Sequence, residues 1–288
     1  MVFGFGVVTA DGRACVGEGM AVRRHSWRVG PGRRQTTVLA VVVAALLVGA
    51  SAGCRSGVSF GASEGGRSHR VAGPRRSDSG EVSVRPGINE KYRKPDVDVW
   101  VGRFEKESRE IFARRDRIVA ATSVGRGMTV ADIGAGTGLF EPLFSKAVGP
   151  EGVVLAVDIV PEFLALIRDR AATLDLHNVR TVRCAEDSVT LAPASIDVAF
   201  LCDTYHHFEY PRSTMRSIYR ALKPGGELVV VDFDRVPGKS RQWILDHVRA
   251  GRDQVTAEIV SDGFLPVTGG PEADFLTENF LLRFTKPQ

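Results

Sequence analysis

The sequence has few cysteines and no internal repeat or heptad pattern. Four of its 288 residues are cysteine, at positions 15, 54, 184 and 202, and none of the intervals between them is a paired metal-ligand spacing. These absences exclude a disulfide framework and a cysteine-based zinc site. Cys184 and Cys202 each fall at the end of an expected strand, where we interpret them as small hydrophobic core residues.

Excess positive charge is missing from the C-terminal two thirds of the chain. Residues 1–95 hold 15 Lys and Arg against 6 Asp and Glu, a net charge of +9, whereas residues 96–288 hold 23 against 28, a net charge of −5. The basic composition therefore belongs to the N-terminal segment. A folded domain of this charge lacks the positive field that binding to a phosphate backbone needs, which argues against nucleic acid as substrate or partner.

The N-terminal segment contains an apolar run from Thr36 to Ala52, at about 17 residues the short limit for a membrane-spanning helix. Arginines precede it and small residues follow it, which is the three-part form of a secretory signal. The residues SAGC, 51–54, resemble a bacterial lipoprotein cleavage box, in which Cys54 would become the lipidated first residue. We expect residues 1–54 to be a signal peptide or membrane-anchor leader that sends the domain to the cell envelope. A cytoplasmic location is the alternative if the leader is not used.

The segment 55–95 is rich in Gly, Ser and Arg and has almost no aromatic residues, which predicts a disordered tether. Residues 96–288 alternate between strand and helix patterns, which predicts an α/β domain whose mainly parallel sheet is covered on both faces. The expected strands span residues 129–133, 152–157, 179–184, 196–201 and 227–232, with late strands near 265 and at 279–284. The expected helices span residues 104–123, 138–147, 161–173, 211–222, 240–250 and 254–261.

The most informative motif is VADIGAGTGLF at residues 130–140, where an apolar strand leads into Gly134, Gly136 and Gly138 and then into a helical pattern. Glycines let the backbone turn and approach a ligand closely, and the helix N-terminus offers free N–H groups. A GxGxxG dinucleotide fingerprint would need glycine where Leu139 stands. Asp158 ends the next apolar run, where its carboxylate can take both hydroxyls of a ribose.

These landmarks resemble the class I S-adenosylmethionine-dependent methyltransferases. That family's first motif is an acid, one residue and then GxGxG, here residues 132–138. RALKPGGELVVVDF at 220–233 resembles its turn before the fifth strand, and DTYHHF at 203–208 lies where its fourth strand ends. Over roughly residues 90–288, the resemblance implies a Rossmann-like, seven-stranded, mainly parallel sheet with helices on both faces and a C-terminal antiparallel hairpin.

The resemblance also implies S-adenosyl-L-methionine as the methyl donor and assigns residues to it. The expected cofactor-binding residues are Asp132, Gly134, Gly136, Gly138, Asp158, Glu186, Asp187 and Asp203, with either Glu186 or Asp187 contacting the adenine. Tyr205, His206 and His207 follow the fourth strand, which in the family faces the transferred methyl group, so we expect them to be catalytic. A histidine there could remove a proton from an O–H, N–H or S–H group. Its alternative role is to cap the next helix or to hydrogen-bond in the core.

Two further groups of residues have open interpretations. Asp203, one of the two histidines, and Asp232 or Asp234 could converge on a divalent ion. Acids at strand ends are common in this fold for other reasons, so we expect no metal. Trp100, Arg103 and Phe104 could form part of a lid over the substrate or pack the first helix onto the sheet.

The sequence therefore predicts a methyltransferase that acts on a small molecule through an O, N or S nucleophile. One alternative is a protein methyltransferase acting on carboxyl groups, because VGPEGVVLAVD at 148–158 resembles isoaspartyl-protein methyltransferases. The other is a surface-tethered binding protein that kept the fold and lost the chemistry. That alternative arises because S-adenosylmethionine is a cytosolic metabolite, whereas the leader predicts a domain outside. The pattern specifies neither the acceptor nor the oligomeric state.

Overall fold

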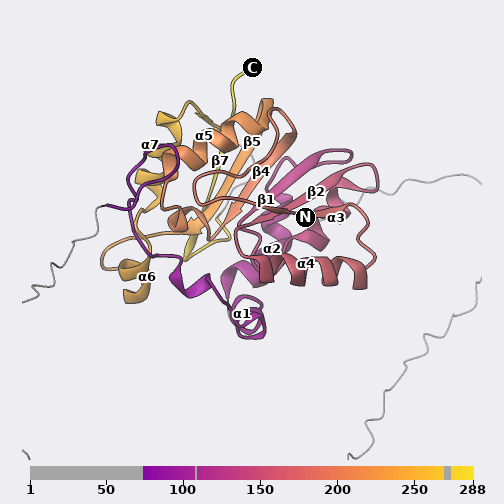
Figure 1. Cartoon of the computed structure of the whole chain (residues 1–288), viewed down its shortest axis with the longest axis horizontal. Helices are drawn as coiled ribbons and strands as arrows, with labels where there is room; N and C mark the ends of the chain where they lie inside the picture. Colours follow the sequence, from indigo (N-terminus) through magenta and orange to yellow (C-terminus); the bar gives the residue numbers. More distant parts are fainter. Residues whose placement is uncertain (1–73, 108, 269–273) are drawn as a thin grey trace, which may run out of the picture. The chain divides into compact units, whose positions relative to one another are not determined.

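The computed structural model describes residues 74–107, 109–268 and 274–288 (Figure 1). The predicted leader, with its apolar run and Cys54, lies outside the described residues, so export, cleavage and lipidation stay predictions. Within the described part of the chain, none of the helices is long and apolar enough to cross a membrane.

A seven-stranded sheet forms the centre of the domain, with the strand order β3-β2-β1-β4-β5-β7-β6. Its strands are β1 (Thr129–Ile133), β2 (Val153–Asp158), β3 (Val179–Arg183), β4 (Ile196–Cys202), β5 (Leu222–Phe233), β6 (Leu265–Pro266) and β7 (Asn279–Thr285). The first five are parallel, and β7 is antiparallel to both β5 and β6. The fold class predicted from the sequence is confirmed.

Helices cover both faces of the sheet: α1 (Val97–Phe104), α2 (Glu110–Ala120), α3 (Glu141–Val148), α4 (Pro161–Thr173), α5 (Pro211–Ala221), α6 (Gln242–His247) and α7 (Arg252–Ser261). Successive strand residues point to opposite faces. Val130 and Phe200 therefore pack against α2 and α3, whereas Ala131 and Leu201 pack against α5 and α7. Figure 1 shows α2, α3 and α4 along one side of the sheet and α5 and α7 along the other.

The single leading helix predicted at 104–123 is wrong, because the structure divides it into α1 and α2. Helix α1 ends at Glu105, whose carboxylate accepts a hydrogen bond from Arg170 Nη1 at 2.6 Å. Helix α2 begins after Arg109, whose backbone is extended. The break lets α1 lie beside the start of α4 while α2 packs on the sheet. The other elements differ from the predicted ranges at their ends by a few residues.

The segment before α1 corrects the predicted tether. Within residues 55–95, those from 74 on are described, and they pack on the domain through the buried carboxylate of Glu209. This carboxylate accepts hydrogen bonds from Ser83 Oγ at 2.9 Å and from the Gly87 N–H at 3.1 Å. The sequence composition predicted a solvated linker here, but Gly87 and Ser83 instead bond to a residue that lies 122 and 126 positions further along the chain. We call residues 75–92 the N-terminal strap.

Candidate functional site

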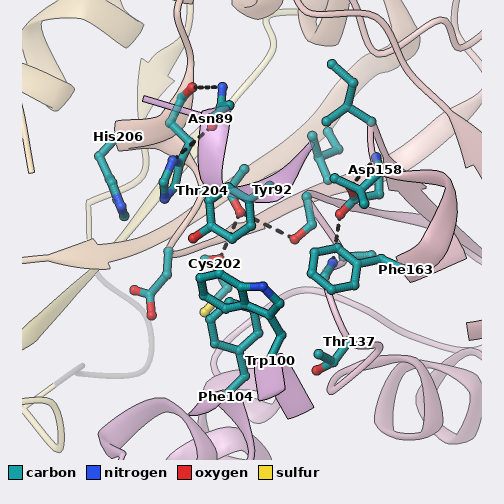
Figure 2. A pocket seen from close by; sticks show the side chains of 18 of the residues that line it. Asn89, Tyr92, Trp100, Phe104, Thr137, Asp158, Phe163, Cys202, Thr204 and His206 are labelled. Carbon is teal, nitrogen blue, oxygen red and sulfur yellow. Dashed lines mark hydrogen bonds between the residues drawn. The ribbon is translucent and has the colours of Figure 1, made fainter. Parts of the chain in front are cut away.

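A cavity of about 1290 Å³ opens at the carboxyl ends of the strands. This edge includes the switch point between β1 and β4, from which the chain order runs in opposite directions, the usual ligand position in an open α/β sheet. Most small-molecule sites measure about 300–1,000 Å³, so this one has room for two ligands side by side. In Figure 2, Asp158 and Thr137 lie on one side of the pocket, and His206 and Asn89 lie on the other.

The predicted glycine loop forms the floor of the cavity, and its geometry requires glycine. Gly134 has φ +76°, and a Cβ there would collide with the side chain of Thr204 from the loop after β4. Gly138 has φ +81°, and its Cβ would lie 2.8 Å from Ile167 of α4. The loop is therefore held between two neighbouring elements at distances that exclude any side chain.

Asp158 is fixed at the tip of β2 by the same loop. Its Oδ2 accepts a hydrogen bond from the Gly136 N–H at 2.8 Å, and its Oδ1 accepts one from the Val160 N–H at 2.8 Å. Burial raises the pKa of Asp158, and these backbone donors limit the rise. The carboxylate lines the cavity with its orientation fixed and retains lone pairs for a ligand hydroxyl.

Asp132 lies deeper, paired with an acid that the sequence analysis did not identify. Asp132 and Glu141, at the start of α3, are both almost fully buried. Burial raises the pKa of both groups, that of Glu141 to about 7, and the charge of Asp158 adds to each rise. Asp132 Oδ2 and both carboxylate oxygens of Glu141 have no hydrogen-bond partner among the described residues. A cationic ligand group above the loop would suit this acid pair.

The turn after β3 contains the two acids Glu186 and Asp187. Ala185 and Ser188 form a bridge that closes the turn. Glu186 lines the cavity, whereas Asp187 is not among the described residues that line it. Of the two acids predicted as alternatives for the adenine contact, Glu186 is therefore the one that lines the cavity, and the contact itself stays a prediction.

Asp203 lines the cavity at the end of β4, but its carboxylate already has partners. It forms an ion pair with Arg109 and accepts a hydrogen bond from Asn279 Nδ2 at 2.7 Å. Burial raises the pKa of Asp203 to about 6, and the nearby guanidinium opposes the rise. This predicted cofactor residue therefore joins the loop to α2 and β7 as well as facing the cavity.

Tyr205 lies on the opposite side from the cavity, which corrects its predicted catalytic role. The turn η2 (Tyr205–His207) sends this side chain into the core, where it is fully buried and its hydroxyl donates to Glu258 Oε2 at 2.8 Å. The two histidines of the same turn line the cavity, as predicted. Successive residues of a tight turn point in different directions, and the sequence does not show which direction faces the ligand.

His206 and His207 are joined by His247 at the end of α6. The ring centroids of His206 and His207 are 4.2 Å apart, and that of His247 lies 5.1 Å from each. Nδ1 of His206 lies 2.7 Å from Asp232 Oδ1, and Nδ1 of His207 lies 3.0 Å from Asn89 Oδ1. Burial lowers the pKa of His207 and brings that of His247 to about 4, so both are neutral at pH 7.

The sequence suggested that Asp203, a histidine and an acid at the end of β5 could converge on a divalent ion, and only part of this group comes together. Asp232 contacts His206, whereas Asp203 is bound to Arg109 and Asn279, and Asp234 lies 3.6 Å from Arg252. The groups gathered at this wall are thus three imidazoles with one carboxylate behind them.

Aromatic residues close the remaining wall. The ring of Trp100 lies 4.6 Å from that of Tyr92 in the strap and 5.2 Å from that of Phe104, centroid to centroid (Figure 2). Arg103 covers the outer face of Trp100 at 4.9 Å. The three α1 residues line the cavity, and Trp100 and Phe104 pack on α4 and the segment before it and not on the sheet, so their role as a lid stays a prediction.

The sequence-based site lacked four residues of the cavity wall, Asn89, Tyr92, Arg109 and His247, and it also lacked Glu141, which is buried beneath the glycine loop. For Glu141 a signal existed, since an acid in the first turn after a glycine loop is a usual feature of a helix start. The others come from segments with no motif, and neither spacing nor periodicity indicates them.

Comparison with known proteins agrees with this geometry. Residues 131–230 match the methyltransferase domain family. A ubiquinone/menaquinone biosynthesis C-methyltransferase, UbiE, of Klebsiella pneumoniae is 30% identical over 118 residues, which are 41% of this chain and 47% of that protein. UbiE of Blochmanniella floridana is 26% identical over 188 residues, covering 53% of this chain and 74% of the relative. The chain spans about half the length of the Klebsiella protein and of several other curated relatives.

The likeness extends to solved structures. A crystal structure of a SAM-dependent methyltransferase from Aquifex aeolicus superposes with a TM-score of 0.57 at 23% identity, covering 67% of this chain and 99% of that one. At this identity the likeness is one of fold. The comparisons therefore show that residues 131–230 are similar to the methyltransferase domain family and that the chain shares the fold of that structure.

Proposed function

We propose that this protein transfers a methyl group from S-adenosylmethionine to a small molecule bound in the same cavity. The observation that carries the proposal is Asp158, held by Gly136 and Val160 at the tip of β2 with its carboxylate on the cavity. An acid in this place can accept hydrogen bonds from both hydroxyls of a ribose. The donor, when bound, supplies a methyl group already activated by the sulfonium charge.

The residues around Asp158 suit the rest of the donor. The buried Asp132 lines the cavity and would face its positive charge, and Glu141 beside Asp132 would add to the negative charge there. Glu186 would lie at the adenine end of the cavity. Methyl transfer needs alignment and exclusion of water more than proton chemistry, and an aromatic wall provides both.

The acceptor would occupy the part of the cavity beside His206 and His207. The cavity of about 1290 Å³ leaves volume beyond a donor for a second small ligand, and the strap residues Asn89 and Tyr92 line it. Two curated relatives are named C-methyltransferases. We therefore consider carbon as an acceptor atom in addition to O, N and S. An acceptor held there could release a proton toward the histidines.

The two alternatives make different predictions. A protein carboxyl methyltransferase would form a methyl ester on a protein acceptor and not on a small molecule. A binding protein with the methyltransferase fold would hold the donor in the cavity but form no product.

Calorimetric titration of the full chain with S-adenosylmethionine tests the donor site. Asp158→Ala should weaken binding at least tenfold, whereas Asp169→Ala, at an exposed position on α4, should not. No binding to the wild type, or equal binding by Asp158→Ala, would overturn the assignment. S-adenosylhomocysteine formed with a pool of small metabolites, measured by mass spectrometry, separates an enzyme from a binding protein.

A further inference from the structure

We propose that His206, His207 and His247 form a binding site for one divalent transition-metal ion on the cavity wall. One ring nitrogen from each of the three lies within 4.8 Å of the other two. The three residues come from two elements, η2 and α6, and all of them line the cavity. The cluster is therefore built by the tertiary fold at the place where we expect the acceptor.

The spacing of the rings is close to that of a bound site. A tetrahedral ion with nitrogen ligands at about 2.1 Å holds those nitrogens about 3.4 Å apart. Here the nitrogens lie within 4.8 Å of one another, so small side-chain rotations would bring them into contact with one ion. His247 is half-buried at the end of a short helix, and its side chain can make this adjustment without moving the sheet.

The groups behind the histidines match those of metal-ligating imidazoles. A ligating histidine usually gives its second nitrogen to a carboxylate or other oxygen, which fixes the ring and its tautomer. Asp232 Oδ1 holds Nδ1 of His206 at 2.7 Å, and Asn89 Oδ1 holds Nδ1 of His207 at 3.0 Å. Nε2 of each ring is thereby left for the ion.

The ligand set selects the class of ion. Imidazole nitrogens suit zinc, iron, nickel and copper, whereas magnesium and calcium prefer oxygen. Arg85 and Lys91 lie near enough to His207 and His247 to repel a cation, and the carboxylate of Asp232 opposes that repulsion. Three protein ligands leave at least one coordination position free, as in catalytic sites.

The next step rests on the proposed function: the free coordination position would bind a hydroxyl oxygen of the methyl acceptor. Coordination lowers the pKa of a hydroxyl, which gives its proton to solvent. The oxygen then forms the new O–C bond while the S–C bond of the donor breaks and the sulfur keeps the electron pair. The acceptor class is thus a small molecule with a hydroxyl that can reach the ion.

Cobalt(II) titration of the untagged, chelator-treated full chain tests the metal site. We expect one equivalent to bind with visible d–d absorption, and zinc to displace it. His247→Ala and His207→Ala should each weaken cobalt binding at least tenfold, and Asp232→Asn should weaken it by about 10- to 100-fold. His177→Ala is the control, because that histidine is exposed and lies outside the cluster.

Absence of stoichiometric cobalt binding, or binding by His247→Ala equal to that of the wild type, would overturn the proposal. Circular dichroism melts identify a variant that fails to fold, in which case His247→Gln replaces it. Calorimetry with S-adenosylmethionine runs in parallel. Donor binding without cobalt binding refutes the metal site alone, and cobalt binding without donor binding refutes the proposed function alone.

Discussion

Nδ1 of His206 lies 2.7 Å from Asp232 Oδ1, and both side chains are buried where β4 and β5 end. The same carboxylate accepts the N–H of His206 at 3.1 Å and that of Phe233 at 2.7 Å. Where Nδ1–H donates to this carboxylate oxygen, the lone pair on Nε2 is available to the cavity. The orientation of His206 is thus fixed by its backbone and its ring together.

This relationship predicts that Asp232 positions His206. Asp232→Asn should lower the rate of S-adenosylhomocysteine formation by about 10- to 100-fold, because the amide can hold the ring in the wrong tautomer. The dissociation constant for S-adenosylmethionine should stay within about twofold, since Asp158 and the glycine loop are unchanged. Asp234→Asn, at a partly exposed neighbour, is the control. Equal turnover in both variants would contradict the role.

The glycine loop predicts a difference between two substitutions with matched backbone conformation. Gly134 and Gly127 have φ +76° and +78°, but a Cβ at Gly127 would meet nothing within 4 Å. Gly134→Ala should therefore lower the free energy of unfolding by about 1–3 kcal/mol more than Gly127→Ala, through its collision with Thr204. Urea unfolding of both variants measures the difference, and equal losses would show that conformation alone requires glycine at 134.

Glu209 predicts the behaviour of the N-terminal strap. Glu209→Ala leaves the Gly87 N–H and the Ser83 hydroxyl without their acceptor, which should cost about 1–3 kcal/mol. Limited proteolysis should then cut within residues 75–92 faster than in the wild type. Glu151→Ala, at an exposed turn, should leave the cleavage rate unchanged. A strap that remains protected in Glu209→Ala would mean that other contacts hold it.

The buried acid pair predicts a pH dependence of stability. The pKa of Glu141 is raised in the fold from 4.5 to about 7, so folding favours its protonated form. Its contribution to stability is fully present below about pH 4.5 and is lost as the pH rises through about 7, by at most about 3 kcal/mol. Glu141→Gln should remove this loss and be more stable than the wild type at pH 8, with the difference shrinking toward pH 5. Urea unfolding across that range, with Glu151→Gln as control, tests it.

Much of the proposed donor site could be predicted from the sequence, because its parts are local. The glycine loop directly follows β1 and Asp158 is the last residue of β2, and parallel strands bring their carboxyl ends to one edge of the sheet. The cavity wall beyond them could not be predicted in this way. Arg109 meets Asp203 across 94 residues, and Asn89 meets His207 across 118.

By itself, the sequence determined most of the strand and helix pattern, the glycine loop and the acid at residue 158, because backbone torsion limits and apolar periodicity act over a few residues. The tertiary structure alone decided that Tyr205 turns into the core, that strap residues line the cavity, and that His247 lies beside His206 and His207. These outcomes depend on how separate elements pack against one another. Packing fixes the direction of each side chain, and local sequence does not encode that direction.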